Sequence, residues 1–208
     1  GEVRWEQRGI DDQITGDSSM QELVKPYKQS LADEMEEVIG QLDTPLYHQH
    51  PEGSLGSWIA DALAEEMEEY TGSAPDFALH NYGGIRLEVL PEGPVTVGRI
   101  YEILPFDNAL VDLSADSATV DTLVEHFMER GGCPLSRGID IRCSDSGYTV
   151  DIAGKPLSGD RIYHIAMPDY IANGGDDCAF LKDNPRISTG YFVRDLMVEY
   201  IREETAEG

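Results

Sequence analysis

Apolar residues recur at helical spacing along two segments near the start of the chain. The first segment spans residues 17–40, with Asp17 or Ser18 as its N-cap and Gly40 as its stop. Pro26 either kinks this helix or marks its first turn, because proline lacks the amide hydrogen that a helix interior requires. A second helix is expected over residues 54–72. The apolar stripes are Met20, Leu23, Val24, Tyr27, Leu31, Met35 and Val38 in the first helix, and Leu55, Trp58, Ile59, Ala62, Leu63, Met67 and Tyr70 in the second.

After residue 72 the chain alternates between short apolar runs and amphipathic segments. Runs typical of strands occupy residues 77–80, 109–113, 138–143, 148–152 and 161–166. Helical patterns occupy residues 96–103, 117–128 and 192–201. Because helices and strands mix without a strict strand–helix–strand rhythm, the pattern predicts an α/β or α+β fold packed in layers. Residues 1–16 are polar and show no period, which is typical of a lead-in segment.

The charge balance excludes one class of partner. The 208 residues include 15 Lys and Arg against 40 Asp and Glu, which gives a net charge of −25. Phosphate backbones bind basic surfaces, so a nucleic acid polymer is not expected as a partner, whereas a small anion needs only a few well-placed arginines. No apolar run approaches the ~18 residues of a membrane helix, so the chain is not expected to span a membrane.

The cysteines and the acidic residues do not suggest a metal site. Cys133, Cys143 and Cys178 are too few for a disulfide scaffold and lack the spacing of zinc ligands. Three buried thiols are favoured over a bridge between Cys133 and Cys143. The acidic face of the second helix is interpreted as a solvated surface rather than a metal site, and its carboxylates belong to Glu65, Glu66, Glu68 and Glu69.

Two loops carry residue types that suit an anionic ligand. In the stretch from Asn81 to Arg86, NYGGIR, Gly83 and Gly84 allow close backbone approach, and the guanidinium of Arg86 suits an oxyanion. In the stretch 104–108, Phe106 lies between a proline and two polar residues, an unusual place for a core aromatic. Taken singly, Arg86 is equally consistent with a surface residue, and a core position is favoured for Phe106.

A third loop, YIANGGDD over residues 170–177, breaks an apolar, helix-like run. Gly174 and Gly175 are a common way to end a helix, because glycine reaches the left-handed conformation at no steric cost. The functional alternative is that the break brings Tyr170 and Asp176 to one ligand. Aromatic rings from two loops, an Arg and an Asp suit a nucleotide. The rings stack on the base, the Asp accepts from ribose hydroxyls, and the Arg faces phosphate.

The motifs SLGSWIADAL, NYGGIR, ILPFDN and YIANGGDD, in this order, resemble the C-terminal domain of the 5′-nucleotidase family. That family includes UDP-sugar hydrolases and cyclic-nucleotide phosphodiesterases of the periplasm and cell surface. The resemblance implies a four-layer α/β/β/α sandwich with mixed sheets. It also divides the chain into a lead-in segment at 1–16, a linker helix and connection at 17–50, and a nucleotide-binding domain at 51–208.

The resemblance assigns roles to the residues of the three loops. Phe106 and Tyr170 match the two aromatics that stack on the base, and Asp176 matches the acid that binds ribose hydroxyls. Asn81 and Arg86 match the loop that faces ribose and phosphate. The glycines that shape these loops are matched by Gly83, Gly84, Gly174 and Gly175.

One position departs from the family pattern in a way that weakens phosphate binding. Gln49 stands where the family has an arginine, and His48 and His50 flank it. Either histidine substitutes in part for the missing charge, or the three residues form an exposed polar turn. The gain in affinity from a nucleoside to its monophosphate is therefore expected to be small.

The chain is not expected to hydrolyse its ligand alone. In the family, catalysis takes place in a separate N-terminal metallophosphatase domain that holds two metal ions. The five histidines here are scattered and do not form such a ligand set, so we expect no catalytic residue and no cofactor in this chain. The divalent metal pair is expected only in a metallophosphatase partner chain or in a missing N-terminal domain.

Two alternatives stay open at this point. The chain is either the recognition domain of a nucleotide-catabolising hydrolase or a stand-alone binding module for nucleosides and nucleotides. A structural domain with a relict pocket would be favoured if Phe106 and Tyr170 were buried side by side. The family resemblance and the start at Gly1, which suggests a processed chain, predict an extracytoplasmic location, in the periplasm or at the cell surface, with a lipid anchor on the precursor as one form of attachment.

Overall fold

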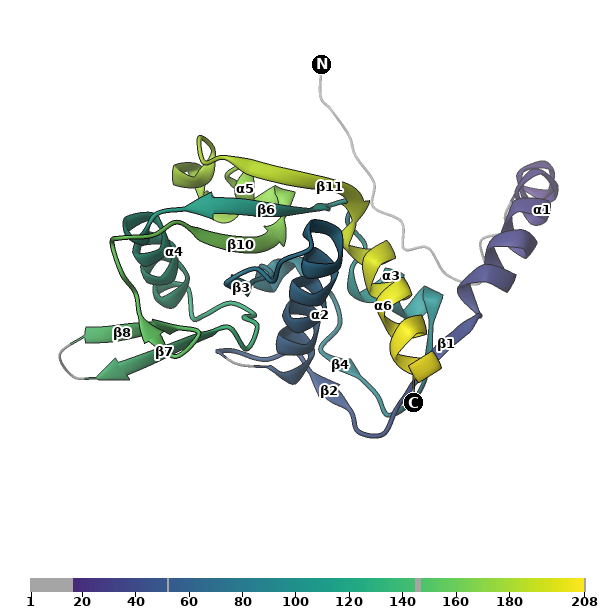
Figure 1. Ribbon diagram of the computed structural model, residues 1–208. Coiled ribbons are helices and arrows are strands. Elements are labelled where there is room, and N and C mark those ends of the chain that lie inside the picture. Colours follow the sequence, from purple (N-terminus) through teal and green to yellow (C-terminus); the bar gives the residue numbers. More distant parts are fainter. Residues whose placement is uncertain (1–16, 52, 145–146, 208) are drawn as a thin grey trace, which may run out of the picture.

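A mixed sheet of four strands forms the centre of the protein (Figure 1). The computed structural model describes residues 17–51, 53–144 and 147–207, so the expected lead-in segment lies outside the described residues. The central strands run in the order β11-β6-β10-β3, in which β6 is antiparallel to both neighbours and β10 is parallel to β3. The expected mixed α/β fold is confirmed. The bounds of the four central strands are β3 Phe77–Ala78, β6 Ala109–Ala115, β10 Tyr163–Pro168 and β11 Arg186–Phe192.

The central sheet separates two hydrophobic clusters. Successive side chains of a strand point to opposite faces, and in β10 Ile165 and Met167 join one cluster while Ala166 joins the other. The cluster with Ala166 includes residues of helices α2, α3 and α6, and the opposite cluster includes residues of α4 and β8. The helices are α2 Ser54–Thr71, α3 Val97–Ile103, α4 Ser117–Glu129 and α6 Val193–Glu207.

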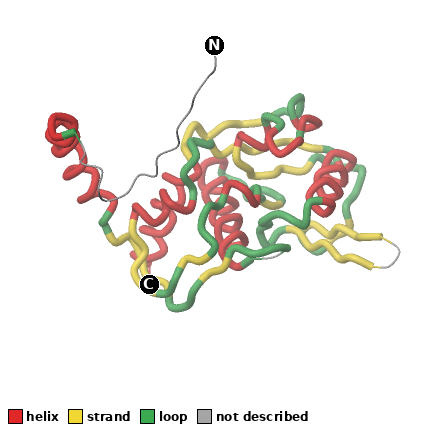
Figure 2. The backbone as a smooth tube through the Cα atoms, turned by 180° about the vertical axis from the view of Figure 1, so that it is seen from behind, coloured by secondary structure: helices red, strands yellow, loops and turns green. Residues whose placement is uncertain are grey.

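Shorter elements complete the fold around this sheet. Strand β1 pairs with β5 and β2 with β4, while β7, β8 and β9 form a separate antiparallel sheet. In both views the β7–β8 hairpin and helix α1 project from opposite ends of the molecule (Figures 1 and 2). The bounds are α1 Ser18–Met35, β1 Val38–Leu42, β2 Leu46–Tyr47, β4 Val89–Leu90, β5 Gly93–Thr96, β7 Ile139–Ser144, β8 Gly147–Ile152, β9 Lys155–Pro156 and α5 Asp169–Ala172.

The first helix is shorter than the apolar pattern predicts. Asp17 caps α1 as expected, because its carboxylate accepts from the amides of Ser19 and Met20. The helix includes Pro26 rather than beginning there, and it ends at Met35 instead of Gly40. A β-carbon on Gly40 would lie 2.5 Å from Ile201 Cγ2 of α6. Gly40 therefore lets strand β1 approach α6, and its role as a helix stop was the wrong interpretation.

The apolar stripe of α1 lies in solvent. Its side chains are between 42% and 74% exposed, and only Met35, at the end of the helix, packs against the hydrophobic cluster beside α2 and α6. In α2 the predicted buried stripe is confirmed except at Trp58, which is partly buried, and at Tyr70, which is 49% exposed. The exposed residues of the α1 stripe are Met20, Leu23, Val24, Tyr27 and Leu31.

The sequence also misjudged one thiol and missed six of the described strands, which are β1, β2, β4, β5, β9 and β11. Cys133 and Cys178 are buried, but Cys143 on β7 is exposed, and all three thiols are free. Strand β11 was not predicted, because most of its side chains are exposed and its sequence lacks an apolar alternation. Within the described part of the chain, no helix has the length and apolar character that crossing a bilayer requires.

Candidate ligand-binding site

The three loops singled out in the sequence emerge at one edge of the central sheet. The NYGGIR loop follows β3, the loop 104–108 precedes β6, and the loop 170–177 follows β10. Because β10 is parallel to β3 and antiparallel to β6, the ends of β3 and β10 lie beside the start of β6. The topology therefore brings together segments that are up to about ninety residues apart in the sequence.

Backbone hydrogen bonds fix the loops to one another. The Arg86 amide donates to the carbonyl of Ile103 at 2.9 Å, which joins the first loop to the end of α3 just before the second loop. The Ala109 amide donates to Asp169 Oδ1 at 3.1 Å, which joins the second loop to the helical turn that carries Tyr170. Since each bond crosses between loops, the relative positions of the three loops are set by the scaffold.

One arginine lies over the Phe106 ring, and a second contacts the residue that follows it. The Phe106 ring is 47% exposed, and the Arg86 guanidinium carbon lies 5.9 Å from the ring centroid. Arg194 of α6 forms an ion pair with Asp107 and lies 4.8 Å from the Tyr101 ring centroid. Phe106 is therefore not a core residue, which was the alternative interpretation of its sequence. Arg194 was missed in the sequence, because nothing in its local pattern indicates a partner nearly ninety residues away.

The turn that begins the first loop packs tightly against buried polar groups. Asn81 is only 4% exposed, and its Oδ1 has no hydrogen-bond partner among the described residues. A β-carbon on Gly84 would lie 2.4 Å from His80 Cε1 and 2.6 Å from Asn81 Oδ1, so glycine is required there. Burial lowers the pKa of His80 to about 4, which keeps this imidazole neutral beneath the loop. Gly83, by contrast, is exposed at the tip of the turn.

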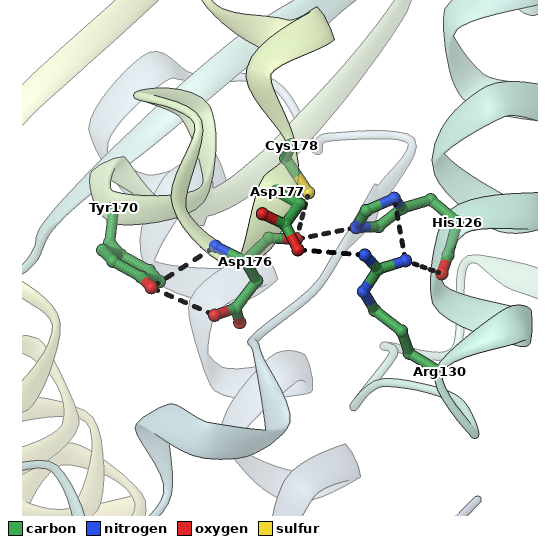
Figure 3. Close-up of polar contacts among 6 residues, drawn as sticks. All are labelled: His126, Arg130, Tyr170, Asp176, Asp177 and Cys178. Atoms are coloured by element: carbon green, nitrogen blue, oxygen red, sulfur yellow. Dashed lines mark hydrogen bonds and ion pairs between the residues drawn. The ribbon is translucent and has the colours of Figure 1, made fainter.

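The break after Tyr170 brings the tyrosine hydroxyl onto Asp176 (Figure 3). The hydroxyl donates to Asp176 Oδ1 at 3.0 Å and accepts from the Asp176 amide at 3.3 Å. Gly174 has a φ of +90°, and a β-carbon on Gly175 would lie 2.4 Å from the Tyr170 ring. Both glycines are therefore needed for this arrangement. Tyr170 is 43% exposed, so it is not buried beside Phe106, and the relict-pocket alternative loses its support.

The histidines that flank Gln49 support the first loop. The rings of His48 and His50 stack on Tyr82 with centroid distances of 3.8 and 3.4 Å. Burial, and then the neighbouring His50, lowers the pKa of His48, which disfavours its cationic form. Gln49 itself is exposed. This geometry gives both histidines a structural contact, and their contribution to phosphate binding stays a prediction.

A hollow of about 310 Å³ lies between the first loop, the end of α4 and the third loop. This volume falls at the lower end of small-molecule sites in proteins. A separate hollow of about 410 Å³ under the β7–β8 hairpin has mainly apolar walls and includes none of the predicted site residues. The hollow between the loops is lined by His50, Tyr82, Gly83, Phe127, Arg130, Gly132, Asp176 and Asp177.

Three carboxylates lie close together between α2 and α6, away from the three loops. One ligand oxygen each from Glu66, Glu69 and Glu203 lies within 4.8 Å of the others, a spacing that a cation would fit. Burial, and then repulsion by Glu203, raises the pKa of Glu66 to about 7. Glu69 and Glu203 are exposed, as expected for a solvated acidic face, whereas Glu66 is half-buried. Exposed acidic groups of this kind are common without an ion.

Comparisons with known proteins agree on one family. A family model described as the 5′-nucleotidase, C-terminal domain, matches residues 38–183. Protein UshA of Yersinia enterocolitica is 23% identical over 200 residues, which cover 93% of this chain and 36% of that protein. Endonuclease YhcR of Bacillus subtilis is 36% identical over 202 residues, which cover 91% of this chain and 16% of that protein.

A solved structure shows the same fold. The 5′-nucleotidase precursor from Thermus thermophilus superimposes with a TM-score of 0.75 at 27% identity, over 89% of this chain and 40% of that protein. The chain thus spans less than half the length of each of these three proteins.

Proposed function

Because the chain belongs to the 5′-nucleotidase family through its C-terminal domain, a substrate-binding module, we propose that it recognises a nucleotide or nucleoside. The observation that carries the proposal is the gathering of the three loops at one sheet edge. This edge presents two partly exposed aromatic rings, those of Phe106 and Tyr170, together with the Asp176 carboxylate. Of the predicted site residues, Asp176 and Gly83 line the hollow between the loops, whereas Phe106, Tyr170 and Arg86 lie outside its lining.

Each group has a definite task in the proposed complex. Phe106 and Tyr170 stack on the base, and Asp176 accepts hydrogen bonds from the vicinal ribose hydroxyls. Arg86 faces the phosphate with the first loop, where Asn81 and the two glycines shape the backbone. Because Gln49 is neutral, phosphate adds little to the affinity.

The chemistry of hydrolysis belongs to another domain in this proposal. The chain binds base and sugar and presents the scissile phosphate to a metallophosphatase domain or partner chain, which carries the divalent metal pair. A role in nucleotide catabolism follows from that arrangement. Support comes from the lengths of the relatives, of which the chain spans 16–40%. Alone, the chain is proposed to be inactive.

The proposed location is extracytoplasmic, in the periplasm or at the cell surface. The solved relative from Thermus thermophilus is described as a precursor, which means that a processed form of that protein exists. Detection of the native protein in the cytoplasmic fraction, with none in the periplasmic or envelope fraction, would contradict this part of the proposal.

Calorimetry with adenosine and AMP tests the binding role. Base–aromatic stacking is worth about 1–3 kcal/mol per base, so Phe106→Ala and Tyr170→Ala should each weaken adenosine binding by about 5- to 150-fold. Tyr70→Ala is a matched control, because this tyrosine is similarly exposed but lies on α2 beside the acidic cluster. If the wild-type chain binds neither ligand, or if all three variants behave alike, the proposed function is wrong.

A stand-alone binding module is the second candidate. The neutral Gln49 in place of an arginine favours it, since a carrier of nucleosides has no need to hold a phosphate. Mixing the chain with a metallophosphatase domain of the family, supplied with Mn²⁺, separates the candidates. Faster release of phosphate from AMP supports the hydrolase component, and unchanged release supports the module. Metal-dependent phosphate release by the isolated chain, abolished by Arg86→Ala, would overturn both.

A further inference from the structure

We propose that His126 of α4 and Arg130, the C-cap residue that follows this helix, are positioning residues that hold Asp176 in place, and thereby determine how strongly the site prefers ribose over sugars without vicinal hydroxyls. The preference for ribose rests on the proposed function. The contacts of His126 and Arg130 with residues 176 and 177, which we call the clamp, are independent of any ligand. Neither His126 nor Arg130 belongs to the three loops, and nothing in the local sequence singled them out.

The backbone at Asp176 needs external support. Asp176 has a φ of 49° and a ψ of 38°, and Asp177 has a φ of 63°. The left-handed conformation is disfavoured for residues that carry a β-carbon, and two such residues in succession are rare. Residues in such conformations persist where several surrounding contacts hold them, and they concentrate at ligand sites.

Helix α4 supplies this support from one side (Figure 3). His126 Nε2 lies 2.7 Å from the carbonyl oxygen of Asp176. Arg130 reaches the same segment, because its Nη2 lies 3.1 Å from Asp177 Oδ2. On the other side, the Tyr170 hydroxyl contacts both the amide and Oδ1 of Asp176. The loop is therefore fixed between α4 and the aromatic ring that is proposed to stack on the base.

The partners of His126 determine which ring nitrogen carries the proton. A carbonyl oxygen can only accept, so Nε2 must be the protonated nitrogen that donates to Asp176. Arg130 Nη1 lies 3.3 Å from His126 Nδ1, and a guanidinium can only donate, so Nδ1 must be the acceptor. Arg130 thus selects the tautomer of His126 that can hold the Asp176 carbonyl.

The clamp acts on the sugar contact, and of the two rings proposed to stack on the base only Tyr170 is bonded to Asp176. Hydrogen bonds weaken steeply when distance and angle depart from their optimum, and two vicinal hydroxyls require a carboxylate in one orientation. Among the described residues no donor reaches Asp176 Oδ2, which is therefore open to a ligand hydroxyl beside the hollow that Arg130 also lines. Stacking on Phe106 requires no such orientation of Asp176.

The test compares adenosine with 2′,3′-dideoxyadenosine by calorimetry. In the wild-type protein the ratio of the two dissociation constants should be about 10- to 150-fold, the range expected for hydrogen bonds to a charged acceptor. His126→Leu should reduce this ratio to less than about 3-fold. His126→Gln should keep most of it, since the Gln amide can still donate to the carbonyl. Glu129→Gln, at an exposed position of the same helix, is the matched control.

A purely structural role predicts a different result. General loosening of the site would weaken both ligands alike and leave their ratio unchanged, and this outcome in His126→Leu would overturn the proposal. Melting temperatures of all variants verify that each is folded. If His126→Leu does not fold, Arg130→Met replaces it, and an unchanged ratio in Arg130→Met would likewise count against the clamp.

A second measurement separates failure of the clamp from failure of the proposed function. Nitrogen NMR shifts of the ligand-free protein should show the Nε2–H tautomer at His126, and Arg130→Met should weaken this preference, because only the Asp176 carbonyl then favours it. The Nδ1–H tautomer in the wild type would overturn the clamp. The expected tautomer in a protein that binds neither nucleoside would leave the clamp standing and contradict the ligand class.

Discussion

Replacing Glu66 by Gln should stabilise the protein at neutral and alkaline pH, and progressively less in acid. Burial of this half-buried carboxyl on α2 raises its pKa from 4.5 to about 7, with further contributions from Glu203 of α6 and Glu69 of its own helix. Gln keeps the size and hydrogen-bonding capacity of the side chain but carries no charge. The substitution therefore removes the penalty of holding a charge among other carboxylates.

The size of the effect follows from the two pKa values. Below pH 4.5 the carboxyl is protonated in both the folded and the unfolded chain, and its full stabilising contribution is present. That contribution is lost as the pH rises through about 7, where the folded state must release its proton. The difference between 4.5 and about 7 corresponds to about 3 kcal/mol. Screening by solvent and salt at this half-exposed position reduces the expected gain to about 1–2 kcal/mol.

Urea denaturation followed by circular dichroism measures this gain. Glu66→Gln should raise the free energy of unfolding by about 1–2 kcal/mol at pH 8, and by less than half of that at about pH 5, which still lies above the isoelectric point. Glu68→Gln removes the same charge from an exposed position of α2 and should change stability by less than about 0.5 kcal/mol. An equal effect of Glu66→Gln at both pH values, or a loss of stability at pH 8, would refute the reasoning.

Two further predictions concern the packing of the third loop and the thiols. Gly175→Ala places a β-carbon within 2.4 Å of the Tyr170 ring, so the ring must move, and adenosine affinity in calorimetry should fall by at least about 5-fold. Unchanged affinity would contradict the tight contact. In a thiol titration of the native protein at pH 8, only Cys143 should react within minutes, because burial raises the pKa of Cys133 to about 12 and of Cys178 to about 11. Rapid reaction of two thiols would show that a buried site opens.

The elements that the sequence predicted well are those whose burial pattern is local. In α2 and α4 the buried positions follow the period of a single helix, so the apolar pattern alone located both helices within about one residue. Gly40 shows the limit of this approach. Glycine at a helix end and glycine beneath a packed helix have the same appearance in sequence, and only the contact with Ile201 distinguishes them.

The residues of the candidate site likewise fall into two groups, those that the sequence could predict and those that it could not. Phe106, Tyr170 and Asp176 lie in short motifs with unusual neighbours, so a reading of the chain alone could single them out. His126 lies in the last turn of an amphipathic helix and Arg130 is its C-cap, and their contacts with Asp176 and Asp177 span about fifty residues. Such contacts depend on how α4 packs on the sheet, which periodicity does not specify.

The solvent-exposed stripe of α1 makes this helix a thermodynamic unit of its own. With 18 residues, it is only slightly longer than the helices that are marginal as isolated peptides in water, and Pro26 removes one of its internal hydrogen bonds. Its helix–coil equilibrium is therefore largely uncoupled from the cooperative unfolding of the body. Amide hydrogens of α1 should exchange with solvent by fraying, while those of β6 and β10 exchange only when the whole sheet opens. On heating, the helical signal should consequently decline gradually before the body melts in a single transition.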